Sequence, residues 1–287
     1  MIRPLAKAEF QLRSSAERFR QAAEVTIGKL PWLRPQVEVE QGHLLIVPQD
    51  LRTPDASFAT EFASGKMGLA GAVADIDDIS PFDARPPSEA WSEALVAFEW
   101  LRDLRAADTP EARETGVALV LDWIDRQRDG RGRDLPTHPR VTALRIMSWL
   151  LNAGFLLEGA PPAVYDKIVD SLLRQVRELV SLASSLVDGR TRLAVELALT
   201  YASLCVSEQE PLIESQTVRL SDILLNHVLK DGGHASRNTA VLVDLLLDLL
   251  PLKQCYVSRN QETPSLVLEA SRWITDMLRH MRMGDGG

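Results

Sequence analysis

The stretch Asp231–Cys255, DGGHASRNTAVLVDLLLDLLPLKQC, gives the clearest indication of the fold class. Its second half is leucine-rich, and apolar residues cover most of the circumference of the helix it predicts. A helix that is apolar on so many sides is buried between neighbours. Gly232 and Gly233 are expected to end the preceding helix, and Asn238 or Ser236 to cap the next. The stretch therefore predicts two helices joined by a short connection, the second inside a helical stack.

Helix starts upstream and downstream recur at an interval of about 50 residues. First helices of successive pairs are expected near residues 88, 139, 190 and 238, and second helices near 110, 162, 214 and 264. Ser88 and the Thr109-Pro110-Glu111 triplet are typical helix starts. Such spacing is typical of stacked helical hairpins, in an open solenoid or a curved α/α toroid. We expect an all-α fold, an incomplete (α/α) toroid of about four hairpins.

Residue-level signals place the helices and the domain boundary. We expect continuous helices over 88–106, 139–157, 162–186, 190–206, 214–229, 238–257 and 264–281, with Pro251 kinking or dividing its helix. The toroid domain would cover 87–287. Residues 1–86 read as an irregular segment, with a short amphipathic helix over 14–28, a strand at 43–47 (HLLIV) and a Gly/Asp/Pro-rich loop over 65–87.

Composition and charge limit the kinds of partner and the cellular compartment that we expect. The chain has 287 residues and 45% hydrophobic residues, so it is not a disordered chain. Its net charge of −8 gives no general attraction to nucleic acid or an anionic membrane. The N-terminus lacks the apolar core of a signal peptide, which predicts a cytoplasmic protein, or a periplasmic one if that end is incomplete. Cys205 and Cys255 are too few for a disulfide framework or a zinc site and are expected to be buried thiols.

Three groups of side chains could carry chemistry. The first is His234, Ser236, Arg237 and Asn238, next to a helix start where free N–H groups favour anions. The alternative is that these residues are caps, with His234 on the surface. The second is a set of six arginines, at 126, 128, 131, 133, 140 and 145, whose guanidinium groups suit carboxylates. The alternative is that they lie in a solvated loop. The third is the tryptophans, including Trp149 four residues after Arg145. Their ring faces could bind sugar rings, or they could be core residues.

Three ordered blocks carry a family resemblance: PPSEAWSEALVAFEWLRDLRAA (86–107), HPRVTALRIMSWL (138–150) and the opening stretch 231–255. They resemble the heparinase II/III-like proteins of bacteria, and PQDLRT (48–53) and RHMRMGDGG (279–287) agree with this. The resemblance implies an N-terminal α/α toroid followed by a C-terminal β-sandwich. It also implies a lyase that cleaves acidic polysaccharides by β-elimination next to a uronic acid. In that reaction a base removes the C5 proton of the uronic acid and an acid protonates the leaving glycosidic oxygen. It needs no metal or nucleotide, so no cofactor is expected.

The resemblance also implies site residues. His234 and Arg237 match the family's DGGH-x-x-R pattern and, with Asn238, are the candidate catalytic residues. Arg145 and Trp149 match a block that lines the toroid and are candidate substrate-binding residues. The substrate-binding set is completed by His138, Arg190 and Arg192, with the last two in place of an asparagine that is typical of the family.

The chain departs from the family at three points. Val241 and Leu242 stand where a catalytic tyrosine is typical, which leaves Tyr201 or Tyr256 as proton donors. The stretch 189–197, GRTRLAVEL, has no asparagine, and the chain stops at Gly287, where a β-sandwich with a catalytic histidine would begin.

We therefore expect the toroid half of a polysaccharide-lyase-type protein, not fully catalytic as this chain alone. Its partners would be an acidic polysaccharide or oligosaccharide and a β-sandwich domain beyond residue 287, with no nucleic acid and no membrane. The alternatives are a non-catalytic module that binds acidic glycans and a helical-repeat scaffold that binds protein.

Overall fold

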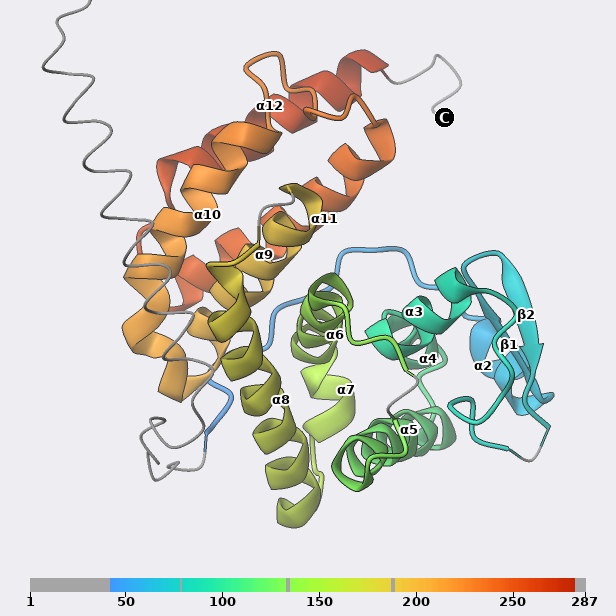
Figure 1. Cartoon of the computed structure of the whole chain (residues 1–287). Helices are drawn as coiled ribbons and strands as arrows, with labels where there is room; N and C mark the ends of the chain where they lie inside the picture. The colour runs from blue at the N-terminus through green and yellow to red at the C-terminus, as the bar shows by residue number, and fades with distance from the viewer. Residues whose placement is uncertain (1–41, 78, 133–134, 187–188, 282–287) are drawn as a thin grey trace, which may run out of the picture.

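The computed structural model describes residues 42–281 except 78, 133–134 and 187–188 (Figure 1). This part is mostly helical, which confirms the all-α fold. The first helices of successive pairs are α3 (Glu89–Ala97), α6 (Pro139–Leu151), α9 (Gly189–Cys205) and α11 (Thr239–Ser258). The second helices are α5 (Pro110–Asp129), α8 (Pro162–Ala183), α10 (Ile213–His227) and α12 (Ser265–Met281). Each begins within one residue of its predicted start.

The first helices form a row in which each packs on the next. Helix α3 contacts α6, α6 contacts α9, and α9 contacts α11. The second helices flank this row: α5 lies against α8, α8 against α6 and α9, and α10 and α12 against each other (Figure 1). Helix α6 therefore has one side toward α9 and α11 and another toward α5 and α8.

Two predicted helices are each divided in the structure. The 88–106 helix is α3 followed by α4 (Leu101–Ala106), because Phe98 takes a left-handed conformation with φ 60°. Phe98 is fully buried among aromatic rings, and its carbonyl oxygen accepts a hydrogen bond of 2.6 Å from Ser148 Oγ. The 139–157 helix is α6 followed by α7 (Ala153–Leu157), with Asn152 at the break. By contrast, α11 runs undivided through Pro251.

The N-terminal segment also differs from prediction. The HLLIV strand is wrong: this stretch is extended but forms a single bridge, Leu44 with Val206, and Leu45 N donates to Cys205 O at 2.8 Å. The strands β1 (Lys66–Leu69) and β2 (Ala72–Asp75) instead form an antiparallel hairpin inside the predicted loop. Ala70 and Gly71 make its turn at φ 50° and 77°, the left-handed pair that two-residue hairpin turns require. The helix predicted over 14–28 lies outside the described residues.

One buried cluster joins the N-terminal segment to the helices. It includes Phe58 of the short helix α2 (Phe58–Ala63), Met67 of β1 and the helical tryptophans. Trp91, Trp100, Trp123 and Trp149 are at most 5% exposed, so they are core residues. Both cysteines are buried and free, as predicted. Among the described helices, none has the length and apolar character needed to cross a bilayer.

Candidate functional site

The candidate site is a groove along α6, formed by two hollows that meet at Leu144, Met147 and Asp248. The first hollow has a volume of about 70 Å³ between α6, α9 and α11. It is completed by Arg140, Arg190, Leu193, Ala194, Leu197, Val241 and Leu245. The second has a volume of about 10 Å³, room for about one water molecule. It is completed by Asp50, Arg52, Glu99, Arg102, Ser148 and Leu151. We call the two hollows together the inner groove.

The inner groove combines an apolar wall with two guanidinium groups. The wall consists of leucine, methionine, alanine and valine side chains of α6, α9 and α11. Arg190, at the start of α9, is exposed, and Arg140, at the start of α6, is half-buried. Within the described part of the chain, no carboxylate lies within ion-pair distance of either guanidinium. The first hollow therefore presents positive charge beside an apolar surface.

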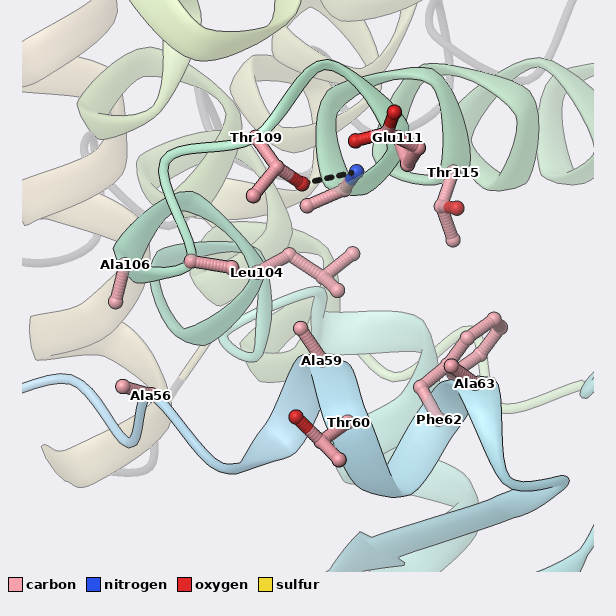
Figure 2. A pocket seen from close by; sticks show the side chains of 12 residues that line it. Ala56, Ala59, Thr60, Phe62, Ala63, Leu104, Ala106, Thr109, Glu111 and Thr115 are labelled. Atoms are coloured by element: carbon pink, nitrogen blue, oxygen red, sulfur yellow. Dashed lines mark hydrogen bonds between the residues drawn. The ribbon is translucent and has the colours of Figure 1, made fainter.

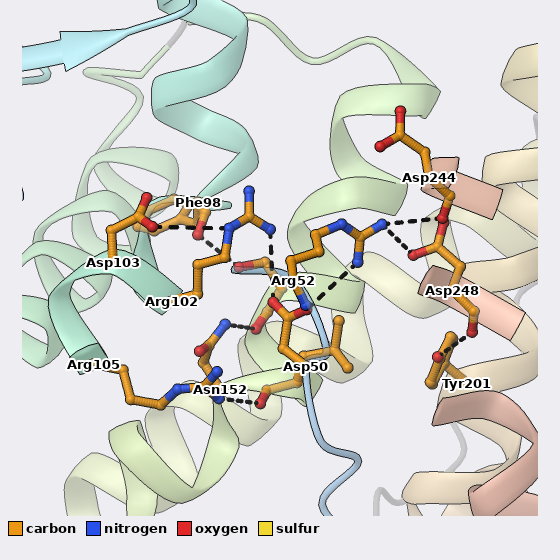
Figure 3. A network of polar contacts seen from close by, with 12 residues as sticks. Asp50, Arg52, Phe98, Arg102, Asp103, Arg105, Asn152, Tyr201, Asp244 and Asp248 are labelled. Atoms are coloured by element: carbon orange, nitrogen blue, oxygen red, sulfur yellow. Dashed lines mark hydrogen bonds and ion pairs between the residues drawn. The ribbon is translucent and has the colours of Figure 1, made fainter. Parts of the chain in front are cut away.

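An ion-pair network closes the other end of the inner groove (Figure 3). Arg52 Nη2 donates to Asp248 Oδ1 of α11 at 2.6 Å and lies 3.4 Å from the Asp244 carbonyl oxygen. Asp50 accepts from the Arg52 backbone N–H at 3.0 Å, and its carboxylate lies 3.6 Å from Arg102 of α4. These contacts fix residues 50–52 between α4 and α11.

Burial sets the protonation of this network. Burial raises the pKa of Asp248 to about 6, which outweighs the attraction of Arg52. Burial also lowers the pKa of Arg52, but the charges of Asp248 and Asp50 outweigh it and raise that pKa above its ordinary value. Tyr201 Oη donates to the Asp248 carbonyl oxygen at 2.6 Å, and burial raises the Tyr201 pKa well above its usual range. Tyr201 is therefore a buried hydrogen-bond donor and not an accessible acid.

The Asp231–Asn238 connection differs from its prediction. Gly232 and Gly233 do not end α10, which stops at His227, where Val228 becomes extended and forms a bridge with His234. Gly232 instead makes the turn of this small loop at φ 81°. A Cβ at Gly232 would lie 2.1 Å from the Trp273 carbonyl oxygen, so the loop is pressed against α12.

His234 is only 2% exposed and has both ring nitrogens in hydrogen bonds. Its Nδ1 accepts from the Ser236 backbone N–H at 3.0 Å and lies 2.7 Å from Ser236 Oγ. This assigns the ring proton to Nε2, which lies 3.0 Å from Nδ1 of His227. Burial, then His227, then Arg190 lower the His234 pKa, which favours a neutral ring. His234 thus holds the loop in place.

The other two candidate catalytic residues also have structural contacts. Arg237, at φ 55°, forms an exposed ion pair of 2.7 Å with Asp231. Asn238 caps α11, where its Oδ1 accepts from Ala240 N at 2.9 Å. The connection and the inner groove are neighbours, since Arg190 acts electrostatically on His234.

Arg145 and Trp149 lie outside the inner groove. Arg145 is 4% exposed and donates to Gln175 Oε1 at 2.6 Å and to the Val96 carbonyl oxygen at 2.8 Å. Its guanidinium lies 4.1 Å from the centre of the Trp123 ring. Trp149 is 2% exposed and meets the Trp123 ring edge-on, so it offers no open face to a sugar.

The remaining candidate substrate-binding residues are dispersed. His138 is exposed and caps α6, with Nδ1 accepting from Arg140 N at 3.3 Å. Arg192 Nε lies 3.8 Å from a carboxylate oxygen of the buried Glu196, so its nearest acid belongs to the protein itself. Tyr256 Oη forms a hydrogen bond of 2.7 Å with Thr217. Of the predicted set, only Arg190 lines the inner groove.

Sequence reasoning missed the network of Arg52, Asp248, Asp50 and Arg102. One signal was present, because Asp248 interrupts a leucine run on the buried side of α11. A buried charge of this kind requires a partner. The partner could not be chosen from the sequence, since Arg52 is 196 residues away.

A roomier hollow, about 700 Å³, lies between α2, α4 and the start of α5 (Figure 2). Most of its lining is alanine and other apolar residues, and Thr109 Oγ1 accepts from Ala112 N at 3.2 Å as a helix cap. Glu111 is its single charged residue. Polar groups do not converge there, so it is a weaker candidate than the inner groove. Among the described residues, no three or more His, Cys, Asp or Glu side chains gather as metal ligands would.

Comparison with known proteins gives one distant likeness. FtsZ-localized protein C of Caulobacter vibrioides is 30% identical to this chain over 240 residues, which are 83% of this chain and 41% of that protein. The chain thus spans about two fifths of the length of this curated relative. No family model matches the sequence. No solved structure matches it either.

Proposed function

We propose that this chain is an incomplete α/α toroid whose inner groove binds an acidic glycan without cleaving it. In this proposal it corresponds to the toroid half of a heparinase II/III-like polysaccharide lyase. The single observation that carries it is the pair Arg140 and Arg190 beside the apolar wall of α6, α9 and α11. The row α3, α6, α9 and α11 supports the toroid, since such folds line their cleft with one helix of each hairpin.

The pairing of charge and apolar surface suits a uronate sugar. A guanidinium binds two carboxylate oxygens at once, which gives both affinity and orientation. The C–H face of a sugar ring packs on apolar side chains such as Leu193 and Met147. A glycan with regularly spaced carboxylates would engage Arg140 and Arg190 together.

Binding without cleavage is supported by the state of the candidate proton-transfer groups. β-Elimination needs a base and an acid within reach of the sugar. Tyr201 and His234 are fully engaged in buried hydrogen bonds. Asp248 lines the groove, but its carboxylate is paired with Arg52. We therefore assign these groups to holding the groove in shape.

The test is binding of a uronate oligosaccharide, with the uncharged oligosaccharide of equal length as the control ligand. Arg140→Gln together with Arg190→Gln should weaken binding at least about tenfold, because two charge-assisted contacts are lost. Arg272→Gln, which removes one charge from the exposed face of α12, should leave the Kd unchanged. Equal binding by wild type and the double variant would overturn the proposal. Formation of an unsaturated uronate, seen by its ultraviolet absorbance, would instead show a lyase.

A second candidate is a helical scaffold that binds protein, and the likeness to FtsZ-localized protein C favours it. We propose for this alternative that the chain acts where FtsZ assembles. Co-sedimentation of the purified chain with FtsZ polymers tests it. Co-sedimentation that survives the Arg140→Gln/Arg190→Gln double variant, with no glycan binding, would favour the scaffold over the glycan module.

A further inference from the structure

A second polar site lies on the opposite side of α6. A pocket of about 240 Å³ opens between α5, α6 and α8, which we call the outer pocket. Its lining consists of Trp123, Gln127, Arg128, Thr137, Thr142, Arg145, Ser171, Arg174, Gln175 and Glu178. Four of its polar side chains are at most 6% exposed: Thr142, Arg145, Ser171 and Gln175. Such a concentration of buried polar groups is unusual inside an apolar helical stack, and it makes the outer pocket a candidate site for a polar ligand.

The partners of Arg145 in the outer pocket are all neutral. Its Nε donates to Gln175 Oε1, Nη1 to the Val96 carbonyl oxygen and Nη2 to Thr142 Oγ1, the last at 3.1 Å. A guanidinium has five N–H donors, so one on each terminal nitrogen has no partner among the described residues. Burial lowers the pKa of Arg145 to about 9, because nothing of opposite charge touches it. A buried cation of this kind is stabilised when an anion reaches it.

Trp123 provides a second donor in the same pocket. Its Nε1 is buried and has no hydrogen-bond partner in the part of the chain that is described. The Arg145 guanidinium covers the Trp123 ring at 4.1 Å, so the two residues form one surface. A buried tryptophan N–H usually has a partner, and leaving it unpaired is unfavourable.

The rim of the outer pocket adds further positive charge. Arg174 and Arg128 are exposed there, and Arg128 is paired with Asp125 and Asp129. Glu178 is the acid that lines the pocket; it is exposed and attracts Arg145 without an ion pair. The donors at the floor therefore outnumber the acids that could satisfy them.

We propose that the outer pocket binds a small oxyanion, a carboxylate, sulfate or phosphate group, through Arg145 and Trp123. The volume of the pocket is close to that of about eight water molecules, which fits such a group with a small organic part. This site is separate from the inner groove and does not depend on the function proposed for that groove.

The first experiment is thermal unfolding of the full chain with phosphate, sulfate, acetate or glucuronate, each against chloride at equal ionic strength. A bound oxyanion should raise the Tm by about 3 °C at tenfold excess over its Kd, and the rise should saturate. The four probes distinguish an inorganic oxyanion from a carboxylate with or without a sugar. Equal Tm values in all five salts would overturn the proposal.

The second experiment supplies the anion from the chain itself. Gln175→Glu places a carboxylate at the position that accepts from Arg145 Nε, and it should raise the Tm in chloride and abolish the further rise with the oxyanion. Gln254→Glu adds the same charge on the exposed side of α11 and should leave the oxyanion response intact. A full response in Gln175→Glu would overturn the proposal.

Two further variants keep the test decisive if Gln175→Glu does not fold. Trp123→Phe keeps a ring under Arg145 but removes the N–H donor, so it should weaken oxyanion binding and reduce the rise in Tm. An unchanged Kd would contradict the assignment of Trp123. The Arg140→Gln/Arg190→Gln variant should retain the whole response, and its loss would place the oxyanion in the inner groove instead.

Discussion

The two sides of α6 use arginine in opposite ways. On the inner side, Arg140 precedes Leu144 and Met147, and it lines an apolar hollow of about 70 Å³. On the outer side, Arg145 is 4% exposed and covers Trp123 in a larger pocket of about 240 Å³. Both arginines belong to one dense basic stretch of sequence. The 3.6-residue period of the helix, and not local charge density, therefore decides which arginine keeps part of its surface exposed and which is buried.

The two sides also differ in how charge is compensated. The buried carboxylate of Asp248 in the inner groove has a guanidinium from the distant Arg52, whereas the buried Arg145 has neutral partners only. The ion pair of the inner groove is therefore satisfied without a ligand, whereas a bound anion would stabilise the buried Arg145 of the outer pocket. This contrast predicts different responses to substitution and to pH.

Among these substitutions, we expect Arg145→Ala to lower the free energy of unfolding most. Arg145→Ala leaves the Gln175 amide oxygen and the Val96 carbonyl oxygen unpaired and removes the group that covers Trp123, so it should lower the free energy of unfolding by about 3–4 kcal/mol. Arg140→Ala on the other side should change it by less than about 0.5 kcal/mol. Urea unfolding followed by tryptophan fluorescence measures both. Equal effects of the two substitutions would remove the contrast between the two sides.

The next effect is pH dependence in the inner groove. The folded pKa of Asp248, about 6, lies above its unfolded value of 3.8, so the folded chain binds this proton more tightly. Stability from this group is therefore present below about pH 4 and is lost as the pH rises through 6. Relative to Asp248→Asn, the wild type should lose about 2 kcal/mol of unfolding free energy between pH 4 and 7. Parallel pH profiles of the two proteins would show that Asp248 is not desolvated.

The smallest effect is expected at the loop beside the inner groove. The His234 pKa is lowered in the folded state, so its contribution is present above pH 6.5 and is lost as the pH falls through the folded value. Below pH 6.5, the unfolding free energy of His234→Gln should therefore fall less with decreasing pH than that of the wild type. His280→Gln, at an exposed position of α12, serves as the control and should leave the profile as in wild type. A wild-type profile in His234→Gln would indicate that this ring is already charged in the native state.

Helix positions were predictable because each start carries its own local signal. Ser88 accepts from Trp91 N, Thr109 from Ala112 N, and Asn238 from Ala240 N, so side chains near each start satisfy the first N–H groups. The breaks at Phe98 and Asn152 were not predictable in the same way. Phe98 leaves the helical conformation to place its ring among Trp100, Trp123 and Trp149, and those neighbours come from three different helices or their flanks.

The site was predictable only in part. Arg190 lines the inner groove, while Arg192 lies two positions later and faces Glu196. A position along a helix follows from sequence, but the neighbouring helix that fills the space beside it does not. The HLLIV stretch shows the same limit, since its bridge partner Val206 is supplied by the end of α9.

The ion pair between Arg52 and Asp248 has a consequence for synthesis on the ribosome. The two residues are separated by 196 positions, so Arg52 is made long before its partner exists. At ordinary translation rates this interval is roughly 10–40 s. Helices from α3 to α10 emerge during that time while residues 50–52 have no α11 to bind. The ion pair that holds residues 50–52 against α11 can therefore form only after α11 has been made, and the contacts of this segment with α4 and α9 are available first.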